Sequence, residues 1–240
     1  MMRLDKYLTE CSGYSRKEAK QLIGKGRVRI NGEAVKRPEC KVEPQSDEIM
    51  LDGNRLTFVE YEYYMLNKPA GVVSATTDSR DTTVVELLNG VSNKELFPVG
   101  RLDKDTEGLL ILTNDGELAH RLLSPKYHVD KMYYVELDNE IKDEDIKAFE
   151  TGIDIGEKKM TKPALLERIT GKSAYVTICE GKYHQIKRMF AACGKTVLYL
   201  KRISMGSIRL DEELEKGAFR SLTEQEIRHL CEDSMKERQV

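Results

Sequence analysis

The residues best suited to chemistry lie in a polar loop that precedes an apolar run. The loop is Gly100–Gly108, and the run Leu109–Thr113 follows it at once. Within the loop, Asp103 has the cations Arg101 and Lys104 on either side. A loop anchored by a rigid strand often carries catalytic groups, and a carboxylate there can act as nucleophile or base. An Asp in a Gly-flanked loop is more often a turn former or helix cap, so spacing alone leaves both interpretations open.

Three segments, in this order along the chain, carry a family resemblance. They are Gly100–Asp103 with Thr106–Leu110 and Thr113–Gly116, then Lys131–Val135, then Glu180–Phe190. They resemble the catalytic loop, the Lys-x-Tyr-x-Val strand and the basic C-terminal motif of the RsuA-type pseudouridine synthases. The resemblance extends over nearly the whole chain. It implies an enzyme, an isomerase that breaks the C1′–N1 bond of a uridine, turns the uracil and rejoins it through C5.

The resemblance also assigns roles to individual residues. Asp103 is the expected catalytic carboxylate, and Lys187 is the cation expected to keep it charged inside a dry pocket. Two unit charges about 4 Å apart attract by roughly 4 kcal/mol at an effective dielectric near 20, enough to offset the effect of desolvation. Tyr133 is expected to stack on the uracil once that base has left its own stack. Tyr134 should point to the opposite face of the same strand and pack there.

The sequence gives no sign of a cofactor or a metal. The isomerisation oxidises nothing and adds nothing, and no Rossmann glycine pattern or Cys-x-x-Cys pair occurs. The run Gly194–Thr196 lacks the upstream glycine of a phosphate-binding loop. Five scattered cysteines suit a reducing compartment, and neither a signal peptide nor a long apolar run is present. We expect a cytoplasmic protein with no cofactor, no metal and no membrane segment.

Charge is distributed unevenly, although the net charge is only −2. Residues 1–41 hold eleven Lys and Arg against five Asp and Glu, an excess of six positive charges, whereas residues 138–157 are acidic. Such asymmetry is expected when only certain surfaces face a polyanion. The predicted RNA-binding residues are Arg16, Lys17, Lys20, Arg27, Arg29, Lys36 and Arg37 near the N-terminus, with Arg101 and Arg188 beside the catalytic motifs.

The N-terminal residues resemble the S4-type RNA-binding module of two helices and a small hairpin sheet. The spacing of apolar residues predicts a helix over residues 3–11, and a capping box at Ser15–Glu18 opens a second helix. Asn31 and Gly32 form a strong two-residue hairpin signal after the strand Arg27–Ile30. We therefore expect an S4-like RNA-binding domain at 1–52.

The rest of the chain alternates short apolar strands with helices, which favours an α+β domain. We expect a linker at 53–61, a synthase domain at 62–232 and a polar tail at 233–240. Helices are predicted at Gly116–Leu123, Glu144–Thr151 and His184–Cys193, and strands include Lys172–Ile178 and Val197–Ile203. The family resemblance implies a long, mostly antiparallel mixed sheet with the active cleft across its middle.

The target is expected to be 16S ribosomal RNA, of the pseudouridine-516 type, as naked RNA or within a small-subunit assembly particle. Two segments, Thr161–Glu167 and Tyr183–Gln185, resemble the small-subunit branch of the family. Alternatives are a 23S rRNA synthase of the same family and a non-catalytic RNA-binding assembly factor. Nothing in the sequence demands more than a monomer.

Overall fold

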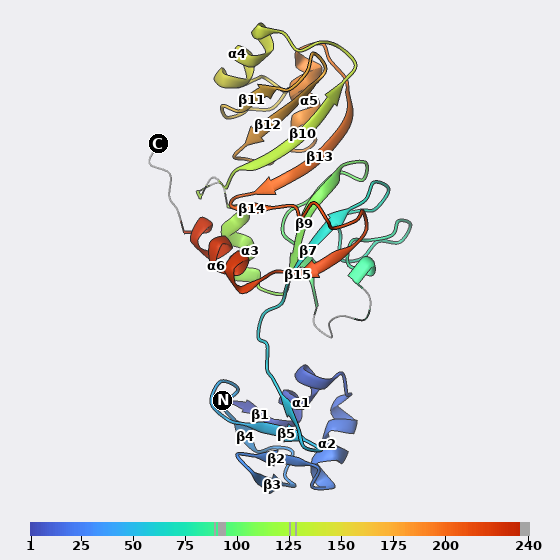
Figure 1. Ribbon diagram of the computed structural model, residues 1–240, viewed down its shortest axis with the longest axis vertical. Coiled ribbons are helices and arrows are strands. Elements are labelled where there is room, and N and C mark those ends of the chain that lie inside the picture. The colour runs from blue at the N-terminus through green and yellow to red at the C-terminus, as the bar shows by residue number, and fades with distance from the viewer. Residues whose placement is uncertain (89, 91–94, 125, 128, 236–240) are drawn as a thin grey trace. The chain divides into compact units, whose positions relative to one another are not determined.

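The computed structural model describes residues 1–88, 90, 95–124, 126–127 and 129–235. The chain forms two compact units, and the first of them contains Met1–Tyr61. Most of the chain from Glu62 onward belongs to the second. Figure 1 labels most of the helices and strands of both units. In the part of the chain that the structure describes, no helix has the length and apolar composition that crossing a bilayer requires.

The first unit has two helices, a two-stranded pair and a four-stranded antiparallel sheet. The helices are α1 (Leu4–Ser12) and α2 (Arg16–Gly24). The two-stranded pair consists of β1 (Met2–Arg3) and β4 (Lys41–Val42). The strands of the sheet lie in the order β3 (Glu33–Val35), β2 (Val28–Ile30), β5 (Ile49–Leu51), β6 (Asn54–Leu56). Ser15 and Glu18 form the predicted capping box. Asn31 and Gly32 both have positive φ, at 50° and 89°, as a tight hairpin requires. Leu4, Leu8 and Ile23 are fully buried in the core of this unit.

The predicted linker is shorter in the structure, because residues 54–56 form β6. Asp52 and Gly53, with φ of 52° and 84°, turn the chain back so that β6 pairs with β5. The sequence did not indicate this strand because it lies at the sheet edge and two of its three residues, Asn54 and Arg55, are exposed and polar. At the other end, the predicted tail begins at the last residue of α6 (Glu224–Asp233), and its residues 236–240 lie outside those described.

The second unit is built on a nine-stranded sheet. Its main path runs β11 (Leu165–Arg168), β12 (Ser173–Ile178), β10 (Lys131–Leu137), β13 (Val197–Met205), β9 (Glu107–Thr113), β7 (Tyr63–Lys68), β15 (Phe219–Ser221), while β14 (Ile208–Arg209) pairs with β13 and β8 (Phe97–Pro98) with β9. Neighbouring strands are antiparallel except β13 and β9, which pair in parallel over two residues. This short parallel junction joins two antiparallel halves, which confirms the predicted α+β class and mixed sheet.

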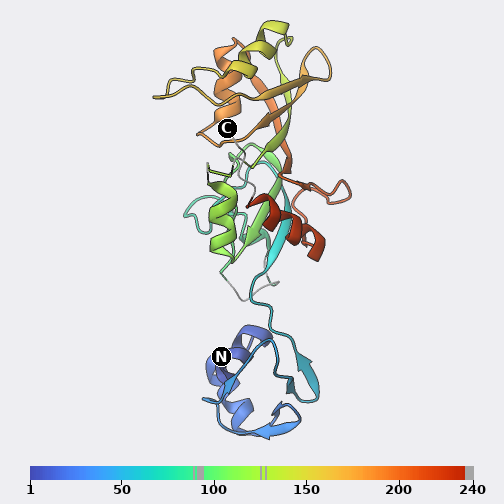
Figure 2. The ribbon, with the colours of Figure 1, turned by 90° about the vertical axis from the view of Figure 1, so that its left-hand side faces the viewer.

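Helices cover both faces of this sheet (Figure 2). α3 (Gly116–Leu123) and α6 pack with Met65, Leu109 and Ile111 on one face of the β9–β7 half. The opposite face continues through both halves as a single core, where α4 (Asp143–Thr151) and α5 (Gln185–Ala192) contribute Phe149 and Phe190. A short 3-10 turn at Glu86–Leu88 completes the helical elements.

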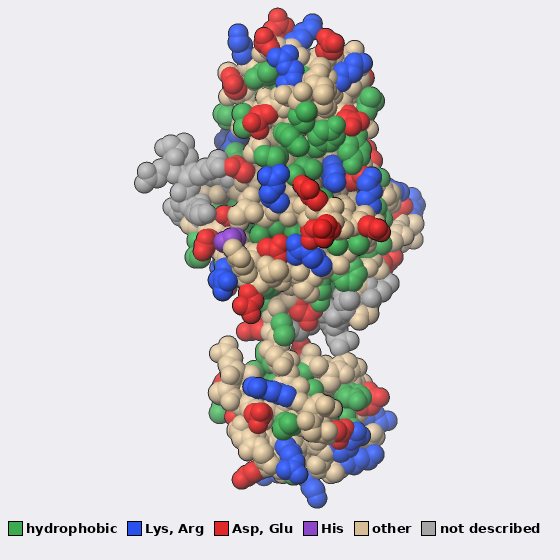
Figure 3. Space-filling view, viewed as in Figure 1, with side chains coloured by type: hydrophobic (Ala, Val, Ile, Leu, Met, Phe, Trp, Pro, Cys, Tyr) green, Lys and Arg blue, Asp and Glu red, His purple; other side chains and the backbone are tan. Residues whose placement is uncertain are grey.

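On the other face of the β10–β13 half, several large hydrophobic side chains are exposed, among them Leu165 at 49% and Leu198 at 67%. Figure 3 shows hydrophobic side chains gathered over β12, β10 and β13 on that face. Tyr134 contacts Tyr175 and Tyr199 there edge to face, with ring centroids 6.0 and 6.2 Å apart. Tyr134 therefore packs on the side opposite Tyr133, as strand alternation predicts.

Candidate active site

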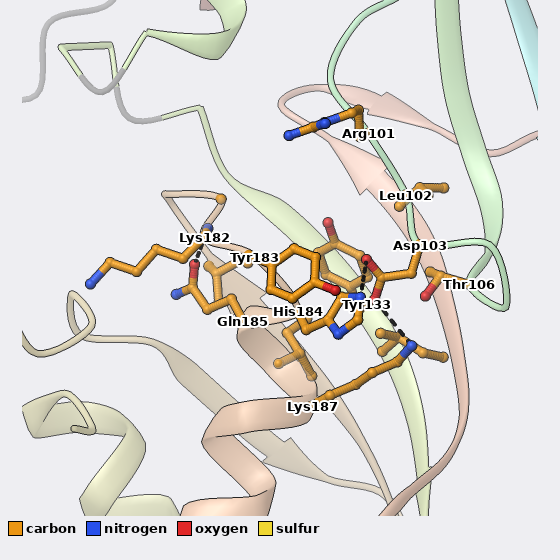
Figure 4. A pocket seen from close by; sticks show the side chains of 14 residues that line it. Arg101, Leu102, Asp103, Thr106, Tyr133, Lys182, Tyr183, His184, Gln185 and Lys187 are labelled. Atoms are coloured by element: carbon orange, nitrogen blue, oxygen red, sulfur yellow. Dashed lines mark hydrogen bonds and ion pairs between the residues drawn. The ribbon is translucent and has the colours of Figure 1, made fainter. Parts of the chain in front are cut away.

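One pocket of about 310 Å³ lies where the two halves of the sheet meet. Asp103 reaches it from the loop before β9, Tyr133 from β10 and Lys187 from α5, as Figure 4 shows. The structure thus brings together the three residues predicted to be catalytic, although they come from distant parts of the sequence. The volume of the pocket is within the range of small-molecule sites, which begins at roughly 300 Å³.

Lys187 pairs with two carboxylates, of which Asp103 lines the pocket. Its Nζ lies 3.0 Å from Asp103 Oδ2 and 2.5 Å from Asp105 Oδ1. Burial would lower the pKa of Lys187, but the hydrogen bonds to Asp105 and Asp103 outweigh it and raise that pKa. The same hydrogen bond from Lys187 lowers the pKa of Asp105. The motifs did not predict the part of Asp105 in this cluster, although its Asp-x-Asp spacing to Asp103 was a signal for it.

Tyr133 forms part of the pocket wall and is 7% exposed. It lies on β10 directly across from Arg202 of β13, and strand neighbours of this kind share a face of the sheet. Arg202 is also buried, and its Nε donates a hydrogen bond of 2.7 Å to the carbonyl oxygen of Leu109 on β9. The tyrosine ring is therefore held at the junction of the two sheet halves, where a planar base can stack on it.

A buried lysine holds the loop that carries Asp103. Lys68, at the end of β7, is fully buried, and its Nζ donates to the carbonyl oxygens of Asp103 (3.1 Å), Lys104 (3.3 Å) and Thr106 (2.9 Å). Burial lowers the pKa of Lys68 to about 8, against the attraction of Asp105 and the neighbouring carboxylates. The sequence predicted this strand but not the role of its lysine, although a lysine that follows the apolar run of a strand is a signal for a specific buried partner.

Gly108 lets β9 approach β13 immediately after this loop. Its φ is +97°, and a Cβ at this position would lie 2.3 Å from the carbonyl oxygen of Arg202. A residue with a side chain does not fit there, so the glycine fixes where the strand begins. On the other side of the loop, Ser74 Oγ donates to the carbonyl oxygen of Leu102 and accepts from its N–H, at 2.9 and 3.0 Å.

The basic C-terminal motif forms the other wall of the pocket. His184 Nε2 lies 3.6 Å from Asp103 Oδ1, and the His184 backbone is left-handed, with φ of 48° and ψ of 35°. The guanidinium of Arg188 donates to Glu157 Oε1 at 2.8 Å, to the carbonyl oxygen of Tyr183 at 3.0 Å and to that of Ile155. In this arrangement Arg188 supports the loop, and its contact with RNA stays a prediction.

Arg101 lines the mouth of the pocket, and its side chain points away from Asp103 in Figure 4. It is exposed, as contact with RNA requires. The next cation along, Lys104, pairs with Asp81 at 2.7 Å instead of entering the pocket.

The seven cations predicted to bind RNA in the first unit are all exposed. Ion pairs join Arg16 to Asp5 at 3.8 Å, Arg37 to Glu39 at 3.1 Å, and Arg27 to Asp52. Arg29 donates to the carbonyl oxygen of Gly32 at 3.1 Å. Contact of these residues, and of Lys17, Lys20 and Lys36, with phosphate stays a prediction.

Metal chemistry has no site among the described residues: no three His, Cys, Asp or Glu side chains there are arranged to hold an ion. The charged side chains that line the pocket are the carboxylate of Asp103 and the cations of Arg101, Lys182 and Lys187. They can supply a nucleophile or base and stabilise developing negative charge.

Comparison with known proteins agrees with this geometry. Residues 62–192 match the family model of the RNA pseudouridylate synthases, and residues 2–49 match that of the S4 domain. The chain belongs to the RNA pseudouridylate synthase family. The predicted resemblance is thereby confirmed, and the synthase match contains the catalytic loop, Tyr133 and Lys187.

Individual relatives of this family match almost the whole chain. An uncharacterised RNA pseudouridine synthase of Bacillus subtilis is 52% identical, with 96% of this chain and 99% of the relative covered. The ribosomal small subunit pseudouridine synthase A of Haemophilus influenzae is 43% identical, with coverage of 95% and 99%. A crystal structure of a pseudouridylate synthase is 42% identical, with a TM-score of 0.69 and coverage of 96% and 100%.

Proposed function

We propose that this pseudouridine synthase converts one uridine of 16S ribosomal RNA to pseudouridine, with Asp103 as the catalytic carboxylate. The observation that carries the proposal is the Asp103–Lys187 contact of 3.0 Å in a pocket walled by Tyr133. The choice of RNA is supported by the 43% identical relatives named ribosomal small subunit pseudouridine synthase A. We also propose that the modified uridine is of the 516 type.

The target uridine must leave its stack before a carboxylate in this pocket can reach it. Stacking on Tyr133 then replaces part of the lost base stacking, and Arg101 at the mouth contacts the displaced RNA. Asp103 acts as nucleophile or base while the C1′–N1 bond breaks. The freed uracil turns, C5 bonds to C1′, the proton on C5 is removed, and N1, which has lost its bond to C1′, is protonated. The C5–H proton that is lost is matched by the N1–H that is gained, so the product is an isomer of the substrate.

Lys187 stabilises the negative charge of Asp103 before the reaction and the charge that develops on the uracil during it. An ammonium fixed by two carboxylates does not have to reorganise in the transition state, and such preorganised charge is the main source of electrostatic catalysis. The S4 module, with its exposed cations, supplies affinity for the phosphate backbone and sets the register.

Mapping pseudouridine in total rRNA with and without the protein tests this function. We expect one carbodiimide-dependent reverse-transcription stop in 16S rRNA to depend on the protein, and Asp103→Asn to remove it while RNA binding is retained. Purified protein is assayed in parallel on 16S RNA and on small-subunit particles. A stop lost from 23S rRNA instead would overturn the choice of RNA, and full turnover by Asp103→Asn would remove Asp103 from its role.

A further inference from the structure

An exposed aromatic ring stands at the mouth of the active pocket. The side chain of Tyr183 is 73% exposed, the largest exposed fraction of any described tyrosine. Its ring lies parallel to the imidazole of His184, with centroids 3.8 Å apart and an interplanar angle of 18°. Figure 4 shows the two rings beside Asp103. One face of the tyrosine is therefore covered by His184, and most of the ring remains in solvent.

The segment that carries these rings is held by several side chains. Gln185 Oε1 accepts from the N–H of Lys182 at 2.9 Å, and Gln185 Nε2 donates to Glu180 Oε1 at 2.9 Å. Arg188 donates to the carbonyl oxygen of Tyr183 at 3.0 Å. The left-handed backbone of His184, rare for a residue with a side chain, turns its ring under that of Tyr183. Strain of this kind is found where a binding or catalytic group must be fixed.

Packing does not explain this arrangement. A tyrosine that stabilises the fold buries its ring, as Tyr133 does at 7% exposure, whereas Tyr183 gains one neighbouring ring and leaves the other face free. Proteins that bind single-stranded nucleic acid stack unpaired bases on aromatic rings with an open face and hold the nucleic-acid backbone with nearby cations. Tyr183 offers such a ring, and Arg101, which lines the same pocket, is such a cation. The ring loses little entropy on binding because it is already in place.

We propose that Tyr183, supported by His184, stacks a second nucleobase, the one that adjoins the target uridine in the chain. The proposal rests on the proposed function, in which Tyr133 receives the target base deeper in the same pocket. It defines the substrate class more closely: the RNA must be unpaired at the target and at one neighbour. His184 is a positioning residue here, because it holds the ring of Tyr183 and lies 3.6 Å from the catalytic carboxylate.

A test combines variants of the full chain with RNAs that lack one base. A 16S rRNA fragment containing the target uridine is prepared with an abasic nucleotide on its 5′ side, on its 3′ side, or on neither. Each RNA is bound to proteins that carry Asp103→Asn, so that binding is measured without turnover, and pseudouridine formation is measured separately with Asp103 intact. The variants are Tyr183→Leu and Tyr183→Phe. Tyr175→Leu is the matched control, because Tyr175 is an exposed tyrosine on the opposite face of the sheet.

We expect removal of one of the two neighbouring bases to weaken binding roughly 5- to 100-fold. Tyr183→Leu should weaken binding of the complete RNA by a similar factor and add no further loss with that abasic RNA. Tyr183→Phe and Tyr175→Leu should bind like the parent. The proposal is overturned if neither abasic RNA binds more weakly, if the losses from RNA and protein multiply, or if Tyr183→Phe is as weak as Tyr183→Leu. If the protein with intact Asp103 forms no pseudouridine, the proposed function is contradicted instead. The binding results would still decide whether Tyr183 stacks a neighbouring base.

Discussion

At the scale of single residues, the pocket depends on how one ammonium is shared. Lys187 lies between Asp103 and Asp105, at 3.0 and 2.5 Å, and all three groups lie at least partly in solvent. The two carboxylates would repel each other without it. The side chains of Lys187 and Asp103 are only 24% and 25% exposed, so solvent screens their attraction incompletely, whereas the side chain of Asp105 is 72% exposed.

We expect Lys187 and Asp105 to respond differently to mutation. Lys187→Met should lower the rate of pseudouridine formation by about 100-fold, since removing one member of a partly buried pair leaves an uncompensated charge. Lys187→Arg keeps the charge and should lose less. Asp105→Asn should change the rate by less than about tenfold, because Lys187 then serves Asp103 alone. Single-turnover rates on the same RNA measure all three, and equal losses for Lys187→Met and Asp105→Asn would show that Asp105 takes part in the chemistry.

The sequence predicted Asp103, Tyr133 and Lys187 because they lie inside recognisable motifs. It did not predict the role of Lys68, because that role depends on where three carbonyl groups of a distant loop come to lie. A motif identifies which side chains can react. It does not reveal which buried cation fixes the backbone beneath them.

At the scale of elements, the junction of β9 with β13 places the catalytic loop. Sequence patterns predicted both strands and located α3 at residues 116–123, where the side chain of Asp115 caps the helix. They did not predict that β9 and β13 pair in parallel, because pairing between distant strands is decided by tertiary packing. Nor did they predict the close approach at Gly108.

Gly108→Ala tests this junction. The added Cβ would meet the Arg202 carbonyl oxygen at 2.3 Å and require a φ of +97°, so we expect a loss of about 2–4 kcal/mol in the free energy of unfolding. The catalytic loop should shift, and pseudouridine formation should fall with it. Gly156→Ala is the control, since Gly156 also has a positive φ, of 76°, but nothing lies within 4 Å of its added Cβ. Urea unfolding compares the two, and equal losses would mean that backbone strain alone, not the contact with β13, explains the effect.

A second element-scale contact ties β15 to α6. Arg220 donates two hydrogen bonds of 2.9 Å to the two carboxylate oxygens of Glu226. This pairing, with a backbone hydrogen bond from Thr223, lowers the pKa of Glu226 from 4.5 to about 2, although burial opposes it. A carboxylate with a lowered folded pKa stabilises the fold above its unfolded pKa and loses that contribution as the pH falls through the folded value.

We therefore expect Glu226→Gln to reduce stability by about 1–2 kcal/mol at pH 7. The difference from the wild type should shrink as the pH falls from 4.5 toward 2, where Glu226 itself becomes protonated. Glu224→Gln, an exposed substitution in the same first helical turn, should change stability by less than about 0.5 kcal/mol. Urea unfolding at several pH values measures this, and a difference that persists unchanged at pH 3 would contradict the assigned ion pair.

At the scale of the whole molecule, the division of labour follows from where charge lies. The net charge of −2 hides an excess of positive charge within the first unit, where residues 1–41 carry eleven Lys and Arg against five Asp and Glu. The acidic stretch at residues 138–157 lies in the second unit, around α4. RNA that is held by phosphate contacts in the first unit needs only a few specific contacts at the pocket.

This division predicts how salt affects binding. Replacing Lys17, Lys20 and Lys36 together by Gln removes three exposed cations of the first unit. The slope of log affinity against log salt should then become shallower by about two, because each lost contact with single-stranded RNA accounts for roughly 0.7. The rate with bound RNA should be unchanged, because these residues lie outside the pocket. The matched control is the triple change of Lys142, Lys147 and Lys172 to Gln. These lysines are equally exposed, but they lie among the carboxylates around α4, which repel phosphate, so the slope should hardly change. Titrations at several salt concentrations measure both proteins, and equal slopes in the two would place the phosphate contacts elsewhere on the molecule.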